Sequence, residues 1–334
     1  MEKSPTIYER MIHLLVVGCH RFAMRIPLNA GLRMAKLFGL AAYFLDAKHR
    51  RIALRNLRFA FGREMGEGGI RETARRNFQQ FAMTGHEWLR LRSVDDETLS
   101  GLVRVEGREH LDAAREKSRS VILLGAHFGN WEYAHLFYAS RINRLNFIVR
   151  AIDNPLLEKE RVRYNDRFGV NILYKENGLR RAIRNLKRGQ DLVIFSDRKA
   201  EEGEDLPCQF FGKKSSSISL VPSLGRRMGI PIVPLFIVRC EDMVHHRMVF
   251  FPELDVGREC PEEKEAVRKA TQRQCEVIEQ AIRAAPDHWV WIHKRWMRDH
   301  PELYPEDVAR RKRRRAKRKA EAKKRQTRKR STGA

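Results

Sequence analysis

The pattern of apolar and polar positions divides the chain into a helical N-terminal part and a longer part in which strands alternate with helices. Residues 1–60 show helical periodicity with a break near Pro27, and residues 70–92 predict a further helix after the glycines at 62–69. Short apolar runs follow, and the strands they predict are 121–126, 147–152, 170–174, 192–196, 232–239 and 248–251. Helices are expected between and after them, at 131–140, from 155 onward, at 179–188 and at 262–285. This alternation indicates an α/β fold, a sheet with helices packed on it.

The net charge is strongly positive and is concentrated at one end. The 334 residues include 67 Lys or Arg and 42 Asp or Glu, a balance of +25. Residues 310–330 hold 15 of the basic residues and a single acid, Glu321, yet the rest of the chain is still basic. The tail has almost no apolar residue beyond Ala, so we expect it to be disordered on its own. Such an excess favours an anionic partner: a membrane surface, an acidic carrier protein or a phosphorylated substrate.

Two apolar stretches near the N-terminus, at 11–19 and 37–45, are too short to cross a bilayer and have four Lys or Arg between them. This pattern favours helices that lie in a membrane interface, and an ordinary pair of packed helices is the alternative. The five Cys residues are scattered without a CxxC pair, so neither a disulfide scaffold nor a metal site is expected.

The segment 121–132, VILLGAHFGNWE, carries the most chemical information. His127 directly follows an expected buried strand, where open α/β sheets place their sites, and Glu132 follows five residues later. The two side chains can meet if His127 lies in the strand-to-helix turn and Glu132 in the first helical turn. A carboxylate would then hold one ring nitrogen and leave the other as a base that activates a hydroxyl of the substrate. The spacing alone is weak, since chance produces roughly one or two His-x4-acid matches in such a chain.

His-Phe-Gly-Asn-Trp-Glu after VILLGA resembles the late acyltransferases of lipid A biosynthesis, the lauroyl and myristoyl transferases of the glycerolipid acyltransferase superfamily, whose signature is His-x4-acid. The resemblance extends from about residue 10 to residue 298 and implies a mixed central sheet flanked by helices. Further blocks occur in the family's order: Arg55-Asn56-Leu57, Arg150 with Asn154-Pro155-Leu156-Leu157, Phe168-Gly169, Phe210-Phe211-Gly212 with Ser217, Pro231-Ile232-Val233-Pro234, and Trp-Val-Trp-Ile-His-Lys-Arg-Trp at 289–296.

The resemblance implies a role for each matching residue. His127 would be the general base and Glu132 the group that orients it. Arg150 would bind phosphate or stabilise an oxyanion, and Asn130 would donate a hydrogen bond. Asp197 matches a family Asp among the residues that bind substrate or stabilise the oxyanion.

The sequence departs from the family pattern just after this Asp. Arg198 stands where Gln is usual and is followed by Lys199, and the loop at 201–205 is more acidic than the pattern leads us to expect. This departure bears on the identity of the substrate.

Other candidates have simpler interpretations. We expect His135 to be structural, His245 and His246 to face solvent, and Ser215–Ser217 to form a turn or a substrate-contact loop. Trp289, Trp291 and Trp296 could form a membrane-interface belt or pack in the core.

The implied function is acyl transfer from acyl carrier protein to a hydroxyl of a lipid A precursor of the Kdo-lipid IVA type in lipopolysaccharide biosynthesis, without metal or cofactor. The enzyme would act at the cytoplasmic face of the inner membrane, peripherally or through an N-terminal anchor. The expected organisation is a membrane-associating region at 1–60, a catalytic domain at 61–305 and a basic tail at 306–334. Alternatives are another acceptor such as a phosphatidylinositol mannoside, acyl-CoA as donor, and, more remotely, nucleic-acid binding through the tail.

Overall fold

The computed structural model describes residues 5–198, 205–310, 313–314 and 321. Most of the expected basic tail and of the acidic loop after Asp197 therefore lies outside the described residues.

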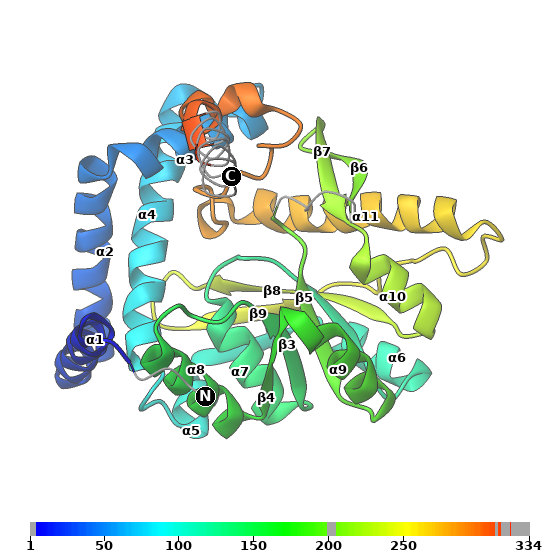
Figure 1. Ribbon diagram of the computed structural model, residues 1–334, viewed down its shortest axis with the longest axis horizontal. Coiled ribbons are helices and arrows are strands. Elements are labelled where there is room, and N and C mark those ends of the chain that lie inside the picture. The colour runs from blue at the N-terminus through cyan, green and yellow to red at the C-terminus, as the bar shows by residue number, and fades with distance from the viewer. Residues whose placement is uncertain (1–4, 199–204, 311–312, 315–320, 322–334) are drawn as a thin grey trace, which may run out of the picture.

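Four helices form an arm along one side of the molecule: α1 (Ile7–Arg25), α2 (Leu28–Leu45), α3 (Ala47–Phe61) and α4 (Glu67–Arg90) (Figure 1). Thr6 caps α1 through a capping box with Glu9, and Pro27 separates α1 from α2. The expected boundary at residue 60 falls at the end of α3. None of the helices in the described part of the chain combines the length and apolar character needed to cross a bilayer.

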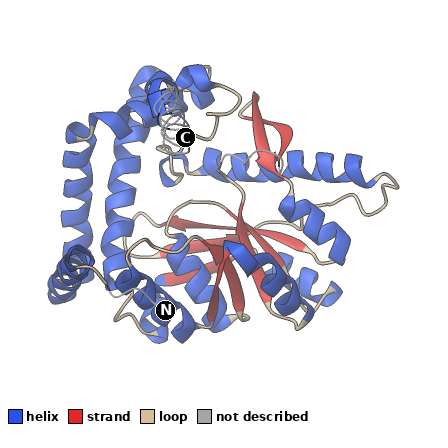
Figure 2. Cartoon of the chain, viewed as in Figure 1, coloured by secondary structure: helices blue, strands red, loops and turns tan. Residues whose placement is uncertain are grey.

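The rest of the chain builds a seven-stranded sheet in the order β1-β9-β8-β2-β5-β3-β4, with helices on both faces (Figure 2). The neighbouring strands are parallel except for β8 and β9, so the expected mixed α/β sheet is confirmed. The strands are β1 (Val103–Glu106), β2 (Ile122–Gly125), β3 (Leu145–Val149), β4 (Val170–Tyr174), β5 (Asp191–Phe195), β8 (Ile232–Arg239) and β9 (His246–Phe250). The helices around them are α5 (Asp96–Leu102), α6 (Arg108–Lys117), α7 (Trp131–Arg141), α8 (Pro155–Phe168), α9 (Lys175–Lys187), α10 (Leu220–Met228) and α11 (Glu263–Ala284).

A separate hairpin of β6 (Asp205–Phe210) and β7 (Lys213–Ile218) packs on α11. Ser215–Ser217 are buried residues of β7, so the expectation of a turn or contact loop there was wrong. Their alternating pairing with β6 satisfies the backbone groups, and small side chains fit where the hairpin meets α11.

The register of the two central strands positions the site. β2 and β5 are parallel neighbours, with Ile122 opposite Leu192 and Gly125 opposite Phe195. All four residues of β2 are buried, because both faces of the sheet are covered. Each β2 residue therefore lies beside the residue seventy positions later, and the two chains leave the sheet at the same edge.

The segment after α11 folds over this edge of the sheet. Trp289, Trp291 and Trp296 are completely buried, and Trp289 pairs with Phe128 through an isolated β-bridge. Their rings contact one another edge to face, with centroids 4.7 Å apart for Trp289 and Trp291. Of the two interpretations of these tryptophans, core packing is confirmed.

Candidate active site

His127 and Asp197 form the central pair of the site. The Nδ1 atom of His127 lies 2.9 Å from Oδ1 of Asp197. A carboxylate only accepts, so Nδ1 carries the proton and donates it, which leaves Nε2 with a free lone pair. The His127 side chain keeps 23% of its surface exposed, whereas that of Asp197 is fully buried. The imidazole can therefore meet a substrate while its partner stays protected from solvent.

Three donors converge on the Asp197 carboxylate. Besides the ring of His127, the backbone N–H of His127 donates to Oδ2 of Asp197 at 3.1 Å, and Nε1 of Trp289 donates to the same oxygen at 2.9 Å. Burial alone would raise the pKa of Asp197, but the charge and hydrogen bond of His127, with His293 and Trp289, hold this pKa well below its usual value. Asp197 is thus an ionised, fixed acceptor, and a fixed negative charge cannot stabilise an oxyanion.

The structure gives His127 a different partner from the one that the spacing suggested. Glu132 lies in the first turn of α7 and accepts a hydrogen bond from the hydroxyl of Tyr164 at 3.3 Å. Its Oε2 atom is also 3.4 Å from Nε2 of His135, one helical turn away. The helix points Glu132 toward α8, while the register of β2 and β5 delivers Asp197 to the ring of His127.

Burial favours a raised pKa for Glu132, but His135, Arg161 and the Tyr164 hydrogen bond lower it. His135 is buried against this carboxylate, which fits its expected structural place.

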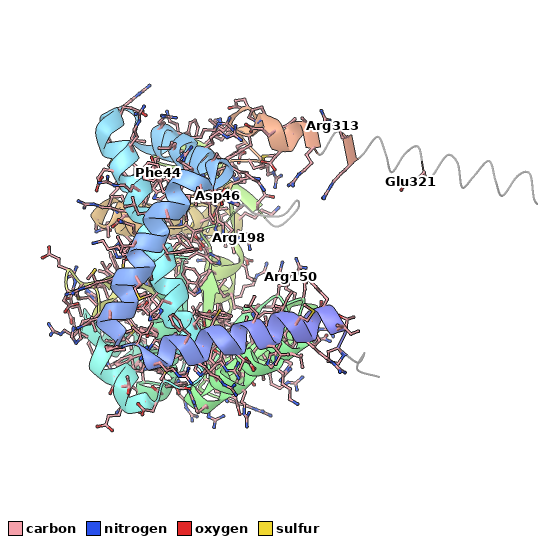
Figure 3. The ribbon with its side chains drawn as sticks, turned by 90° about the vertical axis from the view of Figure 1, so that its left-hand side faces the viewer. Phe44, Asp46, Arg150, Arg198, Arg313 and Glu321 are labelled. Carbon is pink, nitrogen blue, oxygen red and sulfur yellow. The ribbon has the colours of Figure 1, made fainter. Side chains whose placement is uncertain are left out.

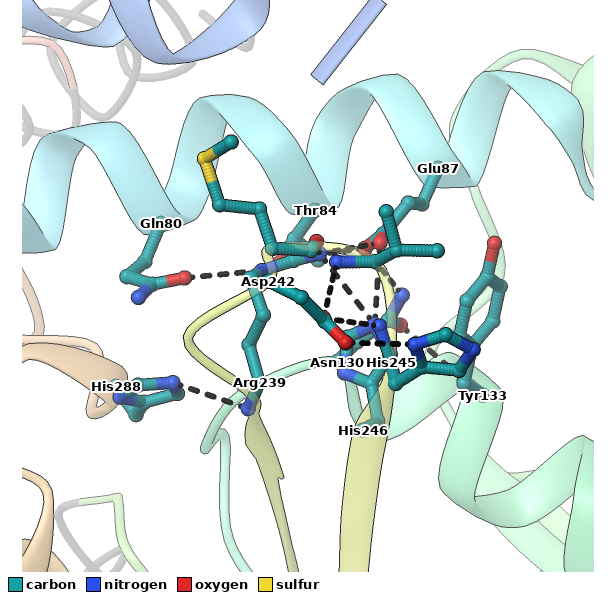
Figure 4. Close-up of polar contacts among 12 residues, drawn as sticks. Gln80, Thr84, Glu87, Asn130, Tyr133, Arg239, Asp242, His245, His246 and His288 are labelled. Atoms are coloured by element: carbon teal, nitrogen blue, oxygen red, sulfur yellow. Dashed lines mark hydrogen bonds and ion pairs between the residues drawn. The ribbon is translucent and has the colours of Figure 1, made fainter. Parts of the chain in front are cut away.

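Asn130 is used within the protein (Figure 4). Its Oδ1 accepts from the backbone N–H of Tyr133 and so caps α7, while its Nδ2 donates to Oε2 of Glu87 at 2.7 Å. The hydrogen bond that Asn130 donates therefore goes to a carboxylate of α4, within the protein.

Glu87 is itself the centre of a buried polar cluster. Arg239 donates to both of its carboxylate oxygens, and Nε2 of His246 lies 3.1 Å from Oε1 (Figure 4). The side chains of Glu87 and His246 are fully buried and that of Arg239 is nearly so. The expectation that His246 faces solvent was therefore wrong, because the strand alternation of β9 turns it inward while the neighbouring His245 stays at the surface beside Asp242.

Arg150 follows β3 and extends into solvent, with 81% of its side chain exposed (Figure 3). It forms an ion pair with Asp153 at 2.9 Å, which is also largely exposed. Such a pair is weak and easily exchanged for another anion. No contact in the described part of the chain joins Arg150 to His127.

His293 is a residue of the site that the sequence did not assign to any role. Its ring lies edge to face against that of His127, with centroids 5.0 Å apart, and its Nδ1 is buried without a hydrogen-bond partner among the described residues. Burial and the neighbouring His127 lower the pKa of His293 to about 4, so the ring is neutral at physiological pH. Asn56 fixes the backbone here by donating to the carbonyls of Trp291 and His293 at 2.6 and 2.8 Å. In the sequence, only the place of His293 in the closing motif at 289–296 could have indicated that it belongs to the site.

His127, Asp197 and His293 are also the group in the described ranges whose ligand atoms come close enough to be considered for a metal, within 4.8 Å of one another. Zinc draws its nitrogen and oxygen ligands to about 2 Å, which requires a tighter set. The hydrogen bond between His127 and Asp197 already uses two of these atoms.

Arg198 marks the departure from the family pattern. Its backbone carbonyl accepts a 2.6 Å hydrogen bond from Arg295, a buried residue that also donates to the carbonyl of Ser216. The Arg198 side chain is exposed at the edge of the site. The chain therefore places an exposed cation directly after Asp197, at the position where the resemblance led us to expect Gln.

Comparison with known proteins identifies the family of the chain. The family model described as bacterial lipid A biosynthesis acyltransferase matches residues 2–298. The chain is 23% identical over 296 residues to the lipid A biosynthesis lauroyltransferase of Escherichia coli, covering 87% of this chain and 92% of that protein. It is 24% identical over 266 residues to the lipid A biosynthesis palmitoleoyltransferase of the same organism, covering 78% and 82%. A sheet-edge histidine held by a buried carboxylate and a match over nearly the whole chain lead to one conclusion: the protein belongs to the bacterial lipid A biosynthesis acyltransferase family and is an acyltransferase.

Proposed function

We propose that this acyltransferase moves a fatty acyl chain from acyl carrier protein to a hydroxyl of a lipid A precursor of the Kdo-lipid IVA type, with His127 as general base and Asp197 as the residue that orients it. The observation that carries the proposal is the 2.9 Å contact between the two side chains at the exit of β2 and β5. The names of the relatives support the acceptor class, since both E. coli proteins are transferases of lipid A biosynthesis.

The chemistry follows from the protonation state of the ring. Nε2 of His127 removes the proton from the acceptor hydroxyl, and the alkoxide forms a bond to the thioester carbonyl carbon. The tetrahedral intermediate collapses, the carbon–sulfur bond breaks, and the imidazolium returns its proton to the leaving thiolate. Asp197 stabilises the imidazolium between these two steps. General-base catalysis of this kind contributes typically 10²–10⁴-fold.

Neutral His293 suits this sequence of steps. When His127 becomes an imidazolium, a second charged imidazole 5.0 Å away would raise the energy of that state. Burial keeps His293 uncharged, so the repulsion is absent.

Arg150 and Arg198 are the cations that we assign to the acceptor. Both side chains are exposed. Arg150 directly follows β3, and Arg198 follows β5 after Ser196 and Asp197, so both lie where strands end at the catalytic edge of the sheet. Phosphate groups of a lipid A precursor can displace Asp153 from Arg150, because charge-assisted contacts to phosphate are stronger than an exposed ion pair.

The N-terminal arm provides a surface for peripheral attachment to the inner membrane. Twelve of the thirteen large apolar side chains that are exposed in the described part of the chain belong to α1 and α2, and Phe44 on this surface is labelled in Figure 3. An apolar groove of about 900 Å³ runs between α1, α2 and α4, lined by residues such as Leu14, Phe22, Met34 and Phe38. An exposed apolar surface of this kind, flanked by basic residues, fits the interfacial region of an anionic bilayer.

The test is an assay with purified protein, a defined acyl carrier thioester and a tetra-acylated lipid A precursor, followed by mass spectrometry of the lipid. We expect a single added acyl ester. Transfer from acyl-CoA only, or to a phosphatidylinositol mannoside only, would replace the donor or the acceptor in the proposal. The absence of transfer in every combination would overturn it.

A further inference from the structure

The attack on the thioester creates a negative charge on the carbonyl oxygen, and that charge needs a hydrogen-bond donor. None of the three residues first considered for this role is placed to supply one. Asp197 is itself an anion, and the amide of Asn130 donates to Glu87. Arg150 extends into solvent, where we assign it to the acceptor. Because removing one oxyanion donor typically costs an enzyme 10²–10³-fold in kcat, the site calls for another donor.

The backbone N–H groups at the base are already in use. That of His127 donates to Oδ2 of Asp197 at 3.1 Å. Those of Phe128 and Gly129 donate to backbone carbonyls at 2.8 and 2.9 Å. These three amides are not free to receive an oxyanion, so the side chains around the ring of His127 have to be considered.

Three rings surround the imidazole of His127 edge to face. The ring centroids of Phe195 and His293 lie 5.0 Å from that of His127, and the centroid of Trp131 lies 5.4 Å from it. Phe195 has no polar hydrogen to donate. Trp131 lines a small apolar cavity between α7 and the sheet, which indicates a packing role. His293 is thus the strongest candidate for a polar donor beside the base.

The burial of the two ring nitrogens of His293 determines where its proton lies. Nδ1 is buried without a partner, whereas Nε2 is not fully buried and has no partner within the described ranges either. With a pKa of about 4, the ring is neutral at physiological pH and carries one N–H. A buried N–H without an acceptor is rarer in proteins than a buried acceptor without a donor, so the proton belongs on Nε2. Nε2 therefore offers a free donor to the site.

The spacing of the two histidines leaves room for the reacting group. A ring nitrogen of His293 lies within 4.8 Å of one of His127. Two hydrogen bonds of about 2.8 Å each can span such a separation with a substrate oxygen between them. A base and a donor at this distance can act on one reacting centre.

The backbone holds the two rings in a fixed relation. The N–H of Val290 donates to the carbonyl of His127 at 3.2 Å, and the N–H of His293 donates to the carbonyl of Val290 at 3.0 Å. Asn56 donates to the carbonyl of His293, and its own Oδ1 accepts from the hydroxyl of Tyr304 at 2.6 Å. Asn56 and Tyr304 are both completely buried. The donor is therefore positioned before the substrate arrives, as stabilisation of a transition state requires.

We infer that Nε2 of His293 donates a hydrogen bond to the thioester carbonyl oxygen and stabilises the oxyanion formed there. This inference rests on the proposed function, because it assigns a further catalytic residue to the same acyl transfer. The acceptor oxygen forms a bond to the carbonyl carbon, and the π electrons of the carbonyl move to its oxygen. His293 keeps its proton throughout. When the carbonyl re-forms and the carbon–sulfur bond breaks, the thiolate takes its proton from His127.

The experiment uses the full chain and an acyl carrier thioester labelled with ¹³C at its carbonyl. His293→Phe keeps an aromatic ring and removes the N–H, while His293→Gln retains an amide donor. The matched control is Trp131→Phe, which removes the other ring N–H beside His127. Transfer kinetics give kcat, KM and the pH–rate profile. Isotope-edited infrared spectroscopy without acceptor gives the stretching frequency of the bound carbonyl.

For His293→Phe we expect kcat to fall by about 10²–10³-fold with little change in KM, because the hydrogen bond strengthens in the transition state. The carbonyl band should move to higher frequency, and the acid limb of the pH–rate profile should remain, because the base is intact. His293→Gln should recover part of the loss. Trp131→Phe should keep the carbonyl band at its wild-type position. His293→Leu gives the same test if the Phe variant does not fold.

An unchanged carbonyl band and kcat in a folded His293→Phe enzyme would overturn the inference. A band shifted by Trp131→Phe instead would also overturn it, by assigning the donor to the indole. Loss of the acid limb in His293→Phe would make His293 the base and exclude it as the donor. A wild-type protein that transfers no acyl chain would refute the proposed function itself, which is a separate outcome.

Discussion

Nδ1 of His127 donates to Oδ1 of Asp197 across 2.9 Å, although seventy residues separate the two in sequence. The contact exists because β2 and β5 are parallel neighbours in register, so the residues that follow each strand meet at one edge. Two central strands of the sheet therefore fix the positions of the proposed base and of the carboxylate proposed to orient it, and Arg150, proposed to bind the acceptor, follows β3 nearer one end of the sheet.

Removing one partner of the buried pair of Glu87 and Arg239 should strongly destabilise the protein. Glu87→Gln leaves Arg239 with an uncompensated buried charge, so we expect a loss of about 3–5 kcal/mol in the free energy of unfolding. Urea unfolding monitored by circular dichroism measures it. Glu265→Gln, which breaks an exposed pair on α11, is the control and should leave the free energy of unfolding nearly unchanged.

A double substitution tests whether this loss of stability comes from the unpaired buried charge. The double variant Glu87→Met, Arg239→Met should lose less free energy of unfolding than the sum of the losses in the single variants Glu87→Met and Arg239→Met. Strictly additive losses would show that the two side chains are not coupled.

His293 should make the protein sensitive to acid. Its pKa of about 4 in the folded protein is below the unfolded value near 6.5, so the unfolded chain binds more protons between these pH values. Stability is therefore present above about pH 6.5 and is lost as the pH falls toward 4, by about 3 kcal/mol for a shift of this size.

His293→Gln removes this titration, and the difference in melting temperature between the variant and the wild type should move in favour of the variant as the pH is lowered from 7 to 4.5. A difference that does not change with pH would contradict a buried neutral imidazole.

The apolar surface of the arm should govern membrane binding. Leu37 and Phe38 of α2 are exposed, and the burial of such a side chain contributes about 1.5–3 kcal/mol. Phe38→Asn should therefore lower the affinity for vesicles of anionic phospholipid, measured by cosedimentation, by roughly tenfold or more. Val162→Asn, an exposed apolar site on α8, is the matched control and should bind as wild type. Equal effects at the two sites would rule out α2 as the membrane-binding surface.

Much of the architecture was predictable because it depends on local periodicity. The runs at 121–126 and 232–239 match β2 and β8 closely, since strands covered on both faces are continuously apolar. The run at 170–174 coincides with β4, an edge strand that is only partly buried. The hairpin of β6 and β7 was missed, because Ser215–Ser217 lack the apolar alternation of a strand and are buried only through their packing on α11. β1 was missed for a related reason, since it is a short edge strand with alternating exposed residues.

The site was only partly predictable. His127 was identified from its place after a strand, but spacing within one segment led to Glu132, because a linear pattern carries no information on which strands are neighbours. Asp197 was noticed as a family match, and its partner became evident only once β5 was seen beside β2. His293 lies 166 positions further along than His127 and reaches it through the folding of the closing segment over the sheet edge.

The most direct test of the account measures single-turnover acyl transfer by three variants: His127→Ala, Asp197→Asn and Glu132→Gln, each shown by circular dichroism to be folded. If Asp197 orients the base, the first two lower kcat by about 10²–10⁴-fold, and Glu132→Gln lowers it by less than about tenfold. A fully active Asp197→Asn enzyme, beside a Glu132→Gln enzyme as inactive as His127→Ala, would contradict the assignment of Asp197 as the residue that orients His127.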